Sequence, residues 1–207
     1  MHDDITAAIA AEAARWVVDT GMAYGPAKAK AAKALARRGG SARHALPSDE
    51  QVEDEVRELL ALFNADSQPG ELQALRELAL GWMDRLSAFR PHLAGAVWRG
   101  TATRHSAIHI DLYCDDGKSA EIALLDQGVR FESGGETTGR GAAPDVLTVA
   151  VPCPALRDIV TLHLMIRDLD DLRGALKPDA RGRTWRGDRQ ALQRLLQQDP
   201  AREAGAP

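Results

Sequence analysis

Apolar residues recur three and four positions apart through most of the first ninety residues. This spacing is typical of amphipathic helices that bury one face. It predicts four helices, which span Asp4–Thr20, 26–38, Asp49–Asn64 and Gly70–Phe89. Ser48, followed three residues later by Gln51, forms a capping-box pattern at the start of the third helix. Residues 1–92 are therefore predicted to form a helical region.

The pattern changes to strands after residue 92. In Ala107–Cys114 apolar and polar residues alternate, which places Ile108, Ile110 and Leu112 on one face of a strand and His109, Asp111 and Tyr113 on the other. Further strands are predicted over Ala94–Arg99, Val129–Glu132, 146–151 and Ile159–Ile166. Helices are predicted over Lys118–Gln127, Asp168–Leu176 and Asp188–Gln197. This order predicts the α+β class, with the helical region packed on a small mixed sheet that has flanking helices.

Composition narrows the class of protein without naming a function. The 207 residues are 44% hydrophobic and 27% charged, which is ordinary for a soluble globular chain. The formal net charge of −4 argues against a general nucleic-acid coat. Cys114 and Cys153 lack the spacing of a metal-binding pair. The sequence has no secretory signal pattern and no apolar run of membrane-spanning length, so we expect a cytoplasmic protein that is not bound to a membrane.

The candidate chemistry lies in the stretch AGAVWRGTATRHSAIHIDLYCDD, residues 94–116. A predicted strand leads into Gly100-Thr101, and the next strand carries Asp111 on its polar face. This order of elements resembles the core of the nucleotidyltransferase fold, the DNA polymerase β-like superfamily. The resemblance covers roughly residues 94–151. It implies that a nucleoside triphosphate is bound through Gly100 and Thr101, with Mg²⁺ or Mn²⁺ as cofactor.

The carboxylate motif of that superfamily is incomplete in this chain. The superfamily places two acidic residues at positions i and i+2 of one strand, and here the partner of Asp111 is His109 or Tyr113. Because Mg²⁺ prefers oxygen ligands, a histidine there favours a softer ion such as Mn²⁺ or Zn²⁺. The resemblance implies a third carboxylate on a neighbouring strand, for which Asp145 is the first candidate and Glu132 the second. A separate metal site of His109, Asp111 and His163 remains an alternative.

A basic segment near the C-terminus supplies candidate phosphate ligands. Its cations surround Trp185 and include Lys177, Arg181, Arg183 and Arg186. Guanidinium and ammonium groups bind phosphate, so this segment is predicted to contact a nucleotide. A basic connector that pairs with acidic helices is the competing interpretation.

Three functional hypotheses follow. The first is a metal-dependent transferase that moves a nucleoside monophosphate from a triphosphate to an unidentified acceptor, an RNA or a protein. Asp111, His109 and Asp145 would be its catalytic residues. The second is a catalytically silent protein of this fold that binds nucleotide, RNA or a protein partner. The third is a hydrolase that uses a His/Asp metal site. We expect a helical region at 1–92, a nucleotidyltransferase-like core at 93–178 and a basic connector, short helix and tail at 179–207. The N-terminal helices are a candidate homodimer surface.

Overall fold

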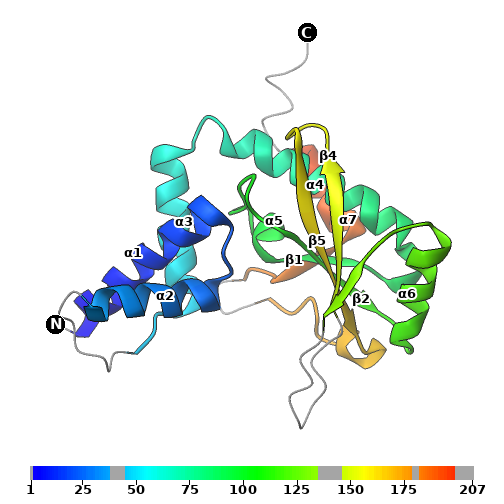
Figure 1. Ribbon diagram of the computed structural model, residues 1–207, viewed down its shortest axis with the longest axis horizontal. Helices are drawn as coiled ribbons and strands as arrows, with labels where there is room; N and C mark the ends of the chain where they lie inside the picture. The colour runs from blue at the N-terminus through cyan, green and yellow to red at the C-terminus, as the bar shows by residue number, and fades with distance from the viewer. Residues whose placement is uncertain (1, 38–44, 135–145, 179–181, 199–207) are drawn as a thin grey trace. The chain divides into compact units, whose positions relative to one another are not determined.

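The computed structural model describes residues 2–37, 45–134, 146–178 and 182–198. They form two compact units. A helical unit comprises Met1–Pro69 together with Thr101–Ser106, and a sheet unit comprises Gly70–Gly100 and Ala107–Pro207. Each unit is described by itself below (Figure 1). In the described part of the chain, no helix combines the length and the apolar character needed to cross a membrane.

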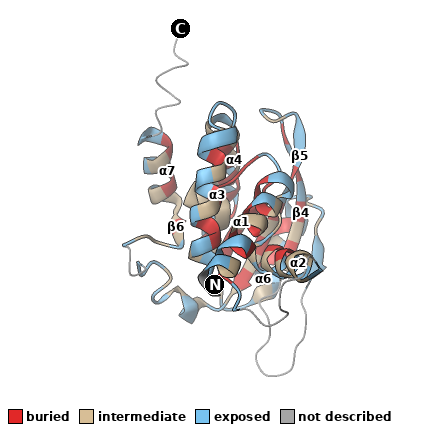
Figure 2. Cartoon of the chain, turned by 90° about the vertical axis from the view of Figure 1, so that its left-hand side faces the viewer, coloured by how far each residue is buried: buried red, intermediate tan, exposed pale blue. Residues whose placement is uncertain are grey.

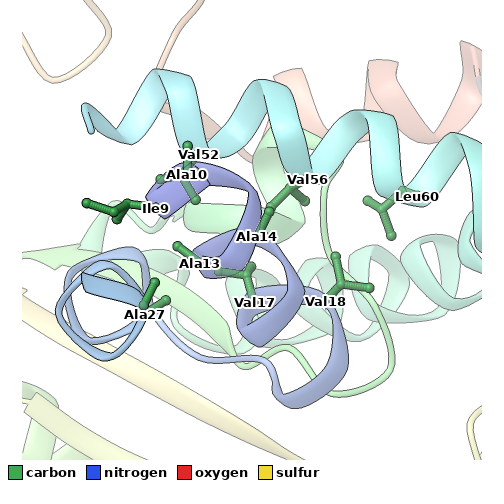
Figure 3. Packing of buried hydrophobic residues seen from close by; sticks show 11 residues of the cluster. Ile9, Ala10, Ala13, Ala14, Val17, Val18, Ala27, Val52, Val56 and Leu60 are labelled. Atoms are coloured by element: carbon green, nitrogen blue, oxygen red, sulfur yellow. The ribbon is translucent and has the colours of Figure 1, made fainter. Parts of the chain in front are cut away.

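Three helices build the core of the helical unit. They are α1 (His2–Thr20), α2 (Tyr24–Arg37) and α3 (Asp49–Phe63). Their buried residues are mostly alanine and valine, small side chains that let helix backbones approach closely: Ile9, Ala10, Ala13, Ala14, Val17, Val18, Ala27, Ala31, Val52, Val56 and Leu60 (Figure 3). The predicted capping box is confirmed, because Ser48 Oγ accepts from the Gln51 amide and Gln51 Oε1 accepts from the Ser48 amide. The apolar stripes therefore form a single packed core.

The sheet unit contains six strands and the helices around them. In chain order its elements are α4 (Gln68–Arg85), η1 (Ser87–Phe89), β1 (His92–Ala94), α5 (Gly95–Arg99), β2 (Ile108–Tyr113), α6 (Gly117–Asp126), β3 (Glu132–Gly134), β4 (Val146–Cys153), β5 (Asp158–Arg167), η2 (Leu169–Leu172), β6 (Arg186–Asp188) and α7 (Arg189–Gln198). The strand order is β3-β4-β5-β2-β1-β6. Only β2 and β5 run parallel among these pairs. The predicted α+β class with a mixed sheet is confirmed.

The two faces of the sheet differ in chemistry. Ile108, Ile110 and Leu112 of β2 are fully buried, as are Leu162 and Leu164 of the neighbouring β5. These residues belong to the apolar face, and buried positions alternate with partly exposed ones along β4 and β5 (Figure 2). The opposite face carries polar side chains and holds the candidate site.

The prediction of a strand over Ala94–Arg99 is wrong. The strand β1 ends at Ala94, Gly95 adopts a left-handed conformation with φ +68°, and residues from Gly95 to Arg99 form the short helix α5. Gly100, with φ +82°, caps the end of that helix. A short apolar run satisfies a buried strand and a buried helical turn equally well, which explains the error. Gly100-Thr101 therefore ends a helix and does not open one.

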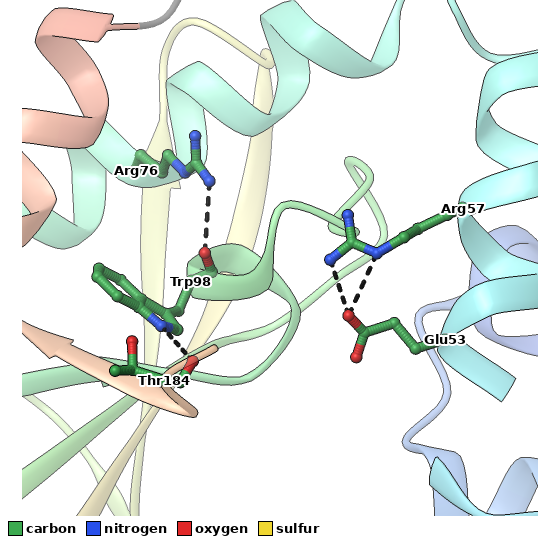
Figure 4. A network of polar contacts seen from close by, with 5 residues as sticks. All are labelled: Glu53, Arg57, Arg76, Trp98 and Thr184. Carbon is green, nitrogen blue, oxygen red and sulfur yellow. Dashed lines mark hydrogen bonds and ion pairs between the residues drawn. The ribbon is translucent and has the colours of Figure 1, made fainter. Parts of the chain in front are cut away.

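A buried arginine fixes the end of α5. Arg76 Nε donates to the carbonyl of Val97 at 3.1 Å, and its Nη2 donates to the carbonyl of Trp98 at 3.4 Å (Figure 4). The Trp98 indole in turn donates to the carbonyl of Thr184 at 2.9 Å. These bonds satisfy carbonyl groups that a helix end leaves without partners. In the helical unit, Glu53 is bound by Arg57 one turn away on α3 (Figure 4).

Other short elements differ from the prediction. The strand expected over Val129–Glu132 begins at Glu132, and the helix expected over Asp168–Leu176 is a single 3-10 turn, η2. The helices α6 and α7 lie where they were expected. The domain boundaries at residues 92 and 178 stay predictions. In the structure, residues of α4 from Gly70 onward belong to the sheet unit.

Candidate functional site

The strand register brings polar side chains together on one face of the sheet. Residues that pair across neighbouring strands project from the same face. One row crosses all six strands and contains Arg186, Ala94, His109, His163, Thr148 and Glu132. The next row begins with Asp188, His92 and Asp111, and a third pairs Tyr113 with Arg167. We call this surface of the sheet unit the polar face.

Two arginines hold Asp111 at the centre of the polar face. Arg167 Nε donates to Asp111 Oδ1 at 2.7 Å, and Arg186 Nη1 lies 3.1 Å from Asp111 Oδ2. The second contact is an ion pair without hydrogen-bond alignment, since Oδ2 has no hydrogen-bond partner among the described residues. The Asp111 side chain is 2% exposed, whereas those of Arg167 and Arg186 are 27% and 23% exposed. Two positive charges therefore surround one negative charge.

Tyr113 and His92 extend this cluster. Arg186 Nη1 donates to the Tyr113 hydroxyl at 2.8 Å, and the rings of Tyr113 and His92 meet edge to face with centroids 5.2 Å apart. Burial raises the pKa of Tyr113, although the hydrogen bond from Arg186 acts in the opposite direction. His92 Nδ1 lies 2.8 Å from the carbonyl of Arg90. A carbonyl only accepts, so the Nδ1 atom of His92 carries a proton and donates it to this bond.

His109 and His163 lie side by side on the parallel strands β2 and β5. Their ring centroids are 5.0 Å apart, and His163 Nδ1 lies 3.1 Å from Thr148 Oγ1. Burial and the neighbouring His163 lower the pKa of His109 to about 4, against the opposing effect of Asp111. Burial also lowers the pKa of His163. Both rings are therefore neutral near pH 7. Gly95 leaves room for this arrangement, because an added Cβ there would lie 3.3 Å from His109 Cδ2.

The described residues of the polar face do not fit a divalent magnesium site. Asp111 directs both oxygens to arginines, and its neighbours on the strand are an imidazole and a phenol. Hard Mg²⁺ requires oxygen ligands whose charge is not already balanced. Across the described part of the chain, no three His, Cys, Asp or Glu side chains gather as a metal site. His109, Asp111 and His163 do not form such a group in that part of the chain, and whether they bind a metal ion stays a prediction.

The other predicted site residues lie in different parts of the structure or outside the described residues. Gly100 lies in the sheet unit and Thr101 in the helical unit. Lys177 lines a cavity of the sheet unit, and Glu132 is exposed on the edge strand β3. Arg183 is half-buried. Asp145 and Arg181 lie outside the described residues.

Sequence reasoning missed Arg167 and the turn at Gly95. Arg167 continues the polar side of β5, two positions beyond Met165 and four beyond His163, so alternation extended by one residue would have identified it. The resemblance to nucleotidyltransferases calls for a strand that delivers a glycine turn to a helix start. In the structure this geometry occurs at β1, Gly95 and α5, five residues before Gly100.

Comparison with known proteins does not assign this chain to a family. No protein-family model matches the sequence, and no curated protein matches it. Among solved structures, a Cid1 poly(U) polymerase with MgGTP bound is similar over 55% of this chain, with 11% sequence identity and a TM-score of 0.36. That polymerase is a nucleotidyltransferase, and the match spans 38% of its length. A similarity at this level carries no residue of that protein over to this chain.

Proposed function

We propose that the polar face binds a nucleotide through its phosphate groups without a divalent metal ion, and that this chain is a catalytically silent protein of nucleotidyltransferase-like type. The observation that carries the proposal is the pairing of Asp111 with both Arg167 and Arg186. In a two-metal transferase this carboxylate would bridge the metal ions. Here guanidinium groups occupy its oxygens.

Charge on the polar face supports an anionic ligand. At the centre of the face, Arg167, Arg186 and Asp111 together carry a net charge of +1, and the adjacent His109 and His163 are neutral near pH 7; the carboxylates Asp188 and Glu132 lie further out on the same face. A positive charge in a half-buried, poorly hydrated site attracts a phosphate group more strongly than an exposed cation does. The centre of the face around Asp111 is therefore better suited to a phosphate group than to a divalent cation.

The geometry of Arg167 supports direct phosphate contact. It binds Asp111 through Nε, and within the described residues its two Nη groups have no hydrogen-bond partner. A guanidinium can use such a pair of donors in a bidentate contact with phosphate oxygens. Arg167 thus serves as a bridge between Asp111 and the ligand, while Arg186 is fixed by Asp111 and Tyr113.

The proposal predicts binding without transfer. Each of ATP, GTP, CTP and UTP is titrated into the protein in EDTA and then in excess Mg²⁺ or Mn²⁺, with pyrophosphate release measured in parallel. We expect at least one triphosphate to bind in EDTA, with no pyrophosphate released under either condition. Metal-dependent pyrophosphate release that disappears in D111A would instead support a transferase.

Matched variants locate the binding. Arg167→Gln should weaken triphosphate binding at least about tenfold, because it removes a charge-assisted bidentate contact. Arg173→Gln is the control, since Arg173 is an exposed arginine that follows η2 in the same unit. Equal losses in the two variants would contradict a specific role for the polar face.

A further inference from the structure

A separate cavity of about 850 Å³ lies in the sheet unit. Its apolar wall is formed by Met83 of α4, Pro91, Leu172 and Leu176. Leu176 is 43% exposed, an unusually open position for a leucine that lines a cavity. The volume falls within the range of small-molecule sites, and the wall offers aliphatic surface to a ligand.

Within the described part of the chain, some cations that line this cavity have an ion-pair partner and others do not. Arg189 is already paired with Asp84, and Asp188 accepts from the Ala191 amide at the start of α7. Arg90 and Lys177 also line the cavity, and neither has an ion-pair partner among the described residues. The lining therefore presents net positive charge beside an aliphatic wall.

Left-handed backbone conformations occur at or near both of these cations. Arg90 adopts a left-handed conformation with φ +46°, a costly state for a residue other than glycine, and its carbonyl accepts from His92. Gly174 has φ +92°, and the Lys177 side chain folds over it, with Cε 3.4 Å from where a Cβ would lie. A side chain at position 174 would strain the turn because of this φ, and its Cβ would meet the Lys177 side chain at ordinary contact distance.

We propose that this cavity binds an amphipathic anion, an aliphatic body with one carboxylate or phosphate head group. The body packs on Pro91, Leu172 and Leu176, and the head group pairs with Arg90 and Lys177. Among the described lining residues there is no Phe, Tyr or Trp, and the one ring, the imidazole of His92, already packs edge to face with Tyr113. The cavity adjoins the polar face, because His92 and Asp188 line both, but Arg90 and Lys177 are not among the residues that bind Asp111.

Four probes test the proposal by isothermal titration below their micelle concentrations: decanoate, decyl phosphate, decyltrimethylammonium and inorganic phosphate. We expect one saturable site for both decyl anions, and binding of the decyl cation at least about tenfold weaker. Inorganic phosphate should not compete for the site, because it lacks the aliphatic body. Equal affinity for the decyl anion and cation would overturn the proposal.

Variants place the site in the cavity. Lys177→Gln should weaken decanoate binding about tenfold, whereas Arg194→Gln, at an exposed position on α7, should leave it unchanged. Leu172→Trp narrows the cavity at its aliphatic wall and should weaken decanoate binding, with circular dichroism as the check on folding. Decanoate affinity unchanged in Lys177→Gln would refute the assignment. None of these three variants changes a residue that binds Asp111, so a failure of this proposal can be told apart from a failure of the nucleotide proposal.

Discussion

Replacement of Asp111 by asparagine has opposite consequences in a metal-dependent transferase and in a protein that binds anions. The change keeps the shape of the side chain and removes its charge. In a transferase it removes a metal ligand and therefore weakens metal-dependent triphosphate binding. In the proposed anion site it removes a negative charge that lies beside Arg167 and Arg186 and that would repel a bound phosphate group.

The structure gives the size of both effects. Removing one partner of a fully buried ion pair costs about 3–5 kcal/mol. Because the two arginines are 27% and 23% exposed, we expect a smaller loss of about 2 kcal/mol, equivalent to about 4–8 °C in Tm. A phosphate charge roughly 6 Å from the carboxylate is repelled by about 1–3 kcal/mol at effective dielectric constants of about 20 to 60. Asp111→Asn should therefore raise triphosphate affinity at least about fivefold.

The assay is calorimetric titration of the triphosphate in EDTA, at a temperature well below the lowered Tm. Asp115→Asn, which removes an exposed carboxylate just beyond β2, is the control and should change neither affinity nor Tm by a comparable amount. Weaker triphosphate binding in Asp111→Asn, with the variant folded, would refute the proposed repulsion between the Asp111 carboxylate and the phosphate.

Three further predictions concern stability of the sheet unit. Because the pKa of His109 is lowered from 6.5 to about 4, the unfolded chain binds more protons between these values, and stability falls by about 3 kcal/mol as pH drops through that window. Urea unfolding midpoints measured in EDTA across this pH window should show the loss of stability. The loss should be smaller in His109→Gln, and an unchanged dependence of the midpoint on pH in that variant would contradict the assignment of the loss to His109. Gly187→Ala should lower the free energy of unfolding by about 1–3 kcal/mol, because the added Cβ would lie 2.0 Å from the Trp98 ring. Gly81→Ala, in an open part of α4, should raise it by about 0.5–1 kcal/mol. Equal midpoints for these two variants would exclude the clash. Arg76→Met should cost about 1–3 kcal/mol in thermal unfolding by freeing two carbonyls of α5, and no change in Tm would show that the cap is dispensable.

The long elements and the polar face of β2 were predictable from sequence. The stripes of α1 and α3, the capping box at Ser48 and the alternation around Asp111 each depend on neighbours within a few residues. Local patterns of this kind are sufficient to specify a helix or a half-buried strand. They also predicted that His109 and Asp111 share one face.

The partners of Asp111 were not predictable from local patterns. Arg167 lies 56 positions further along the chain, and Arg186 follows on a three-residue strand that was not predicted. Whether a strand carboxylate holds a metal ion or a guanidinium depends on which strands become neighbours, and periodicity does not contain that information. The prediction for the short helix α5 was wrong for a different reason. Its apolar run is compatible with two backbone conformations, a strand and a helical turn.

Metal independence of triphosphate binding tests the central claim most directly. The dissociation constant of the tightest-binding triphosphate is measured in EDTA and again with excess Mg²⁺, for the wild-type chain and for Arg167→Gln. We predict that binding persists in EDTA, that Mg²⁺ does not strengthen it, and that Arg167→Gln weakens it under both conditions. Binding that requires Mg²⁺ and is insensitive to Arg167→Gln would contradict the account.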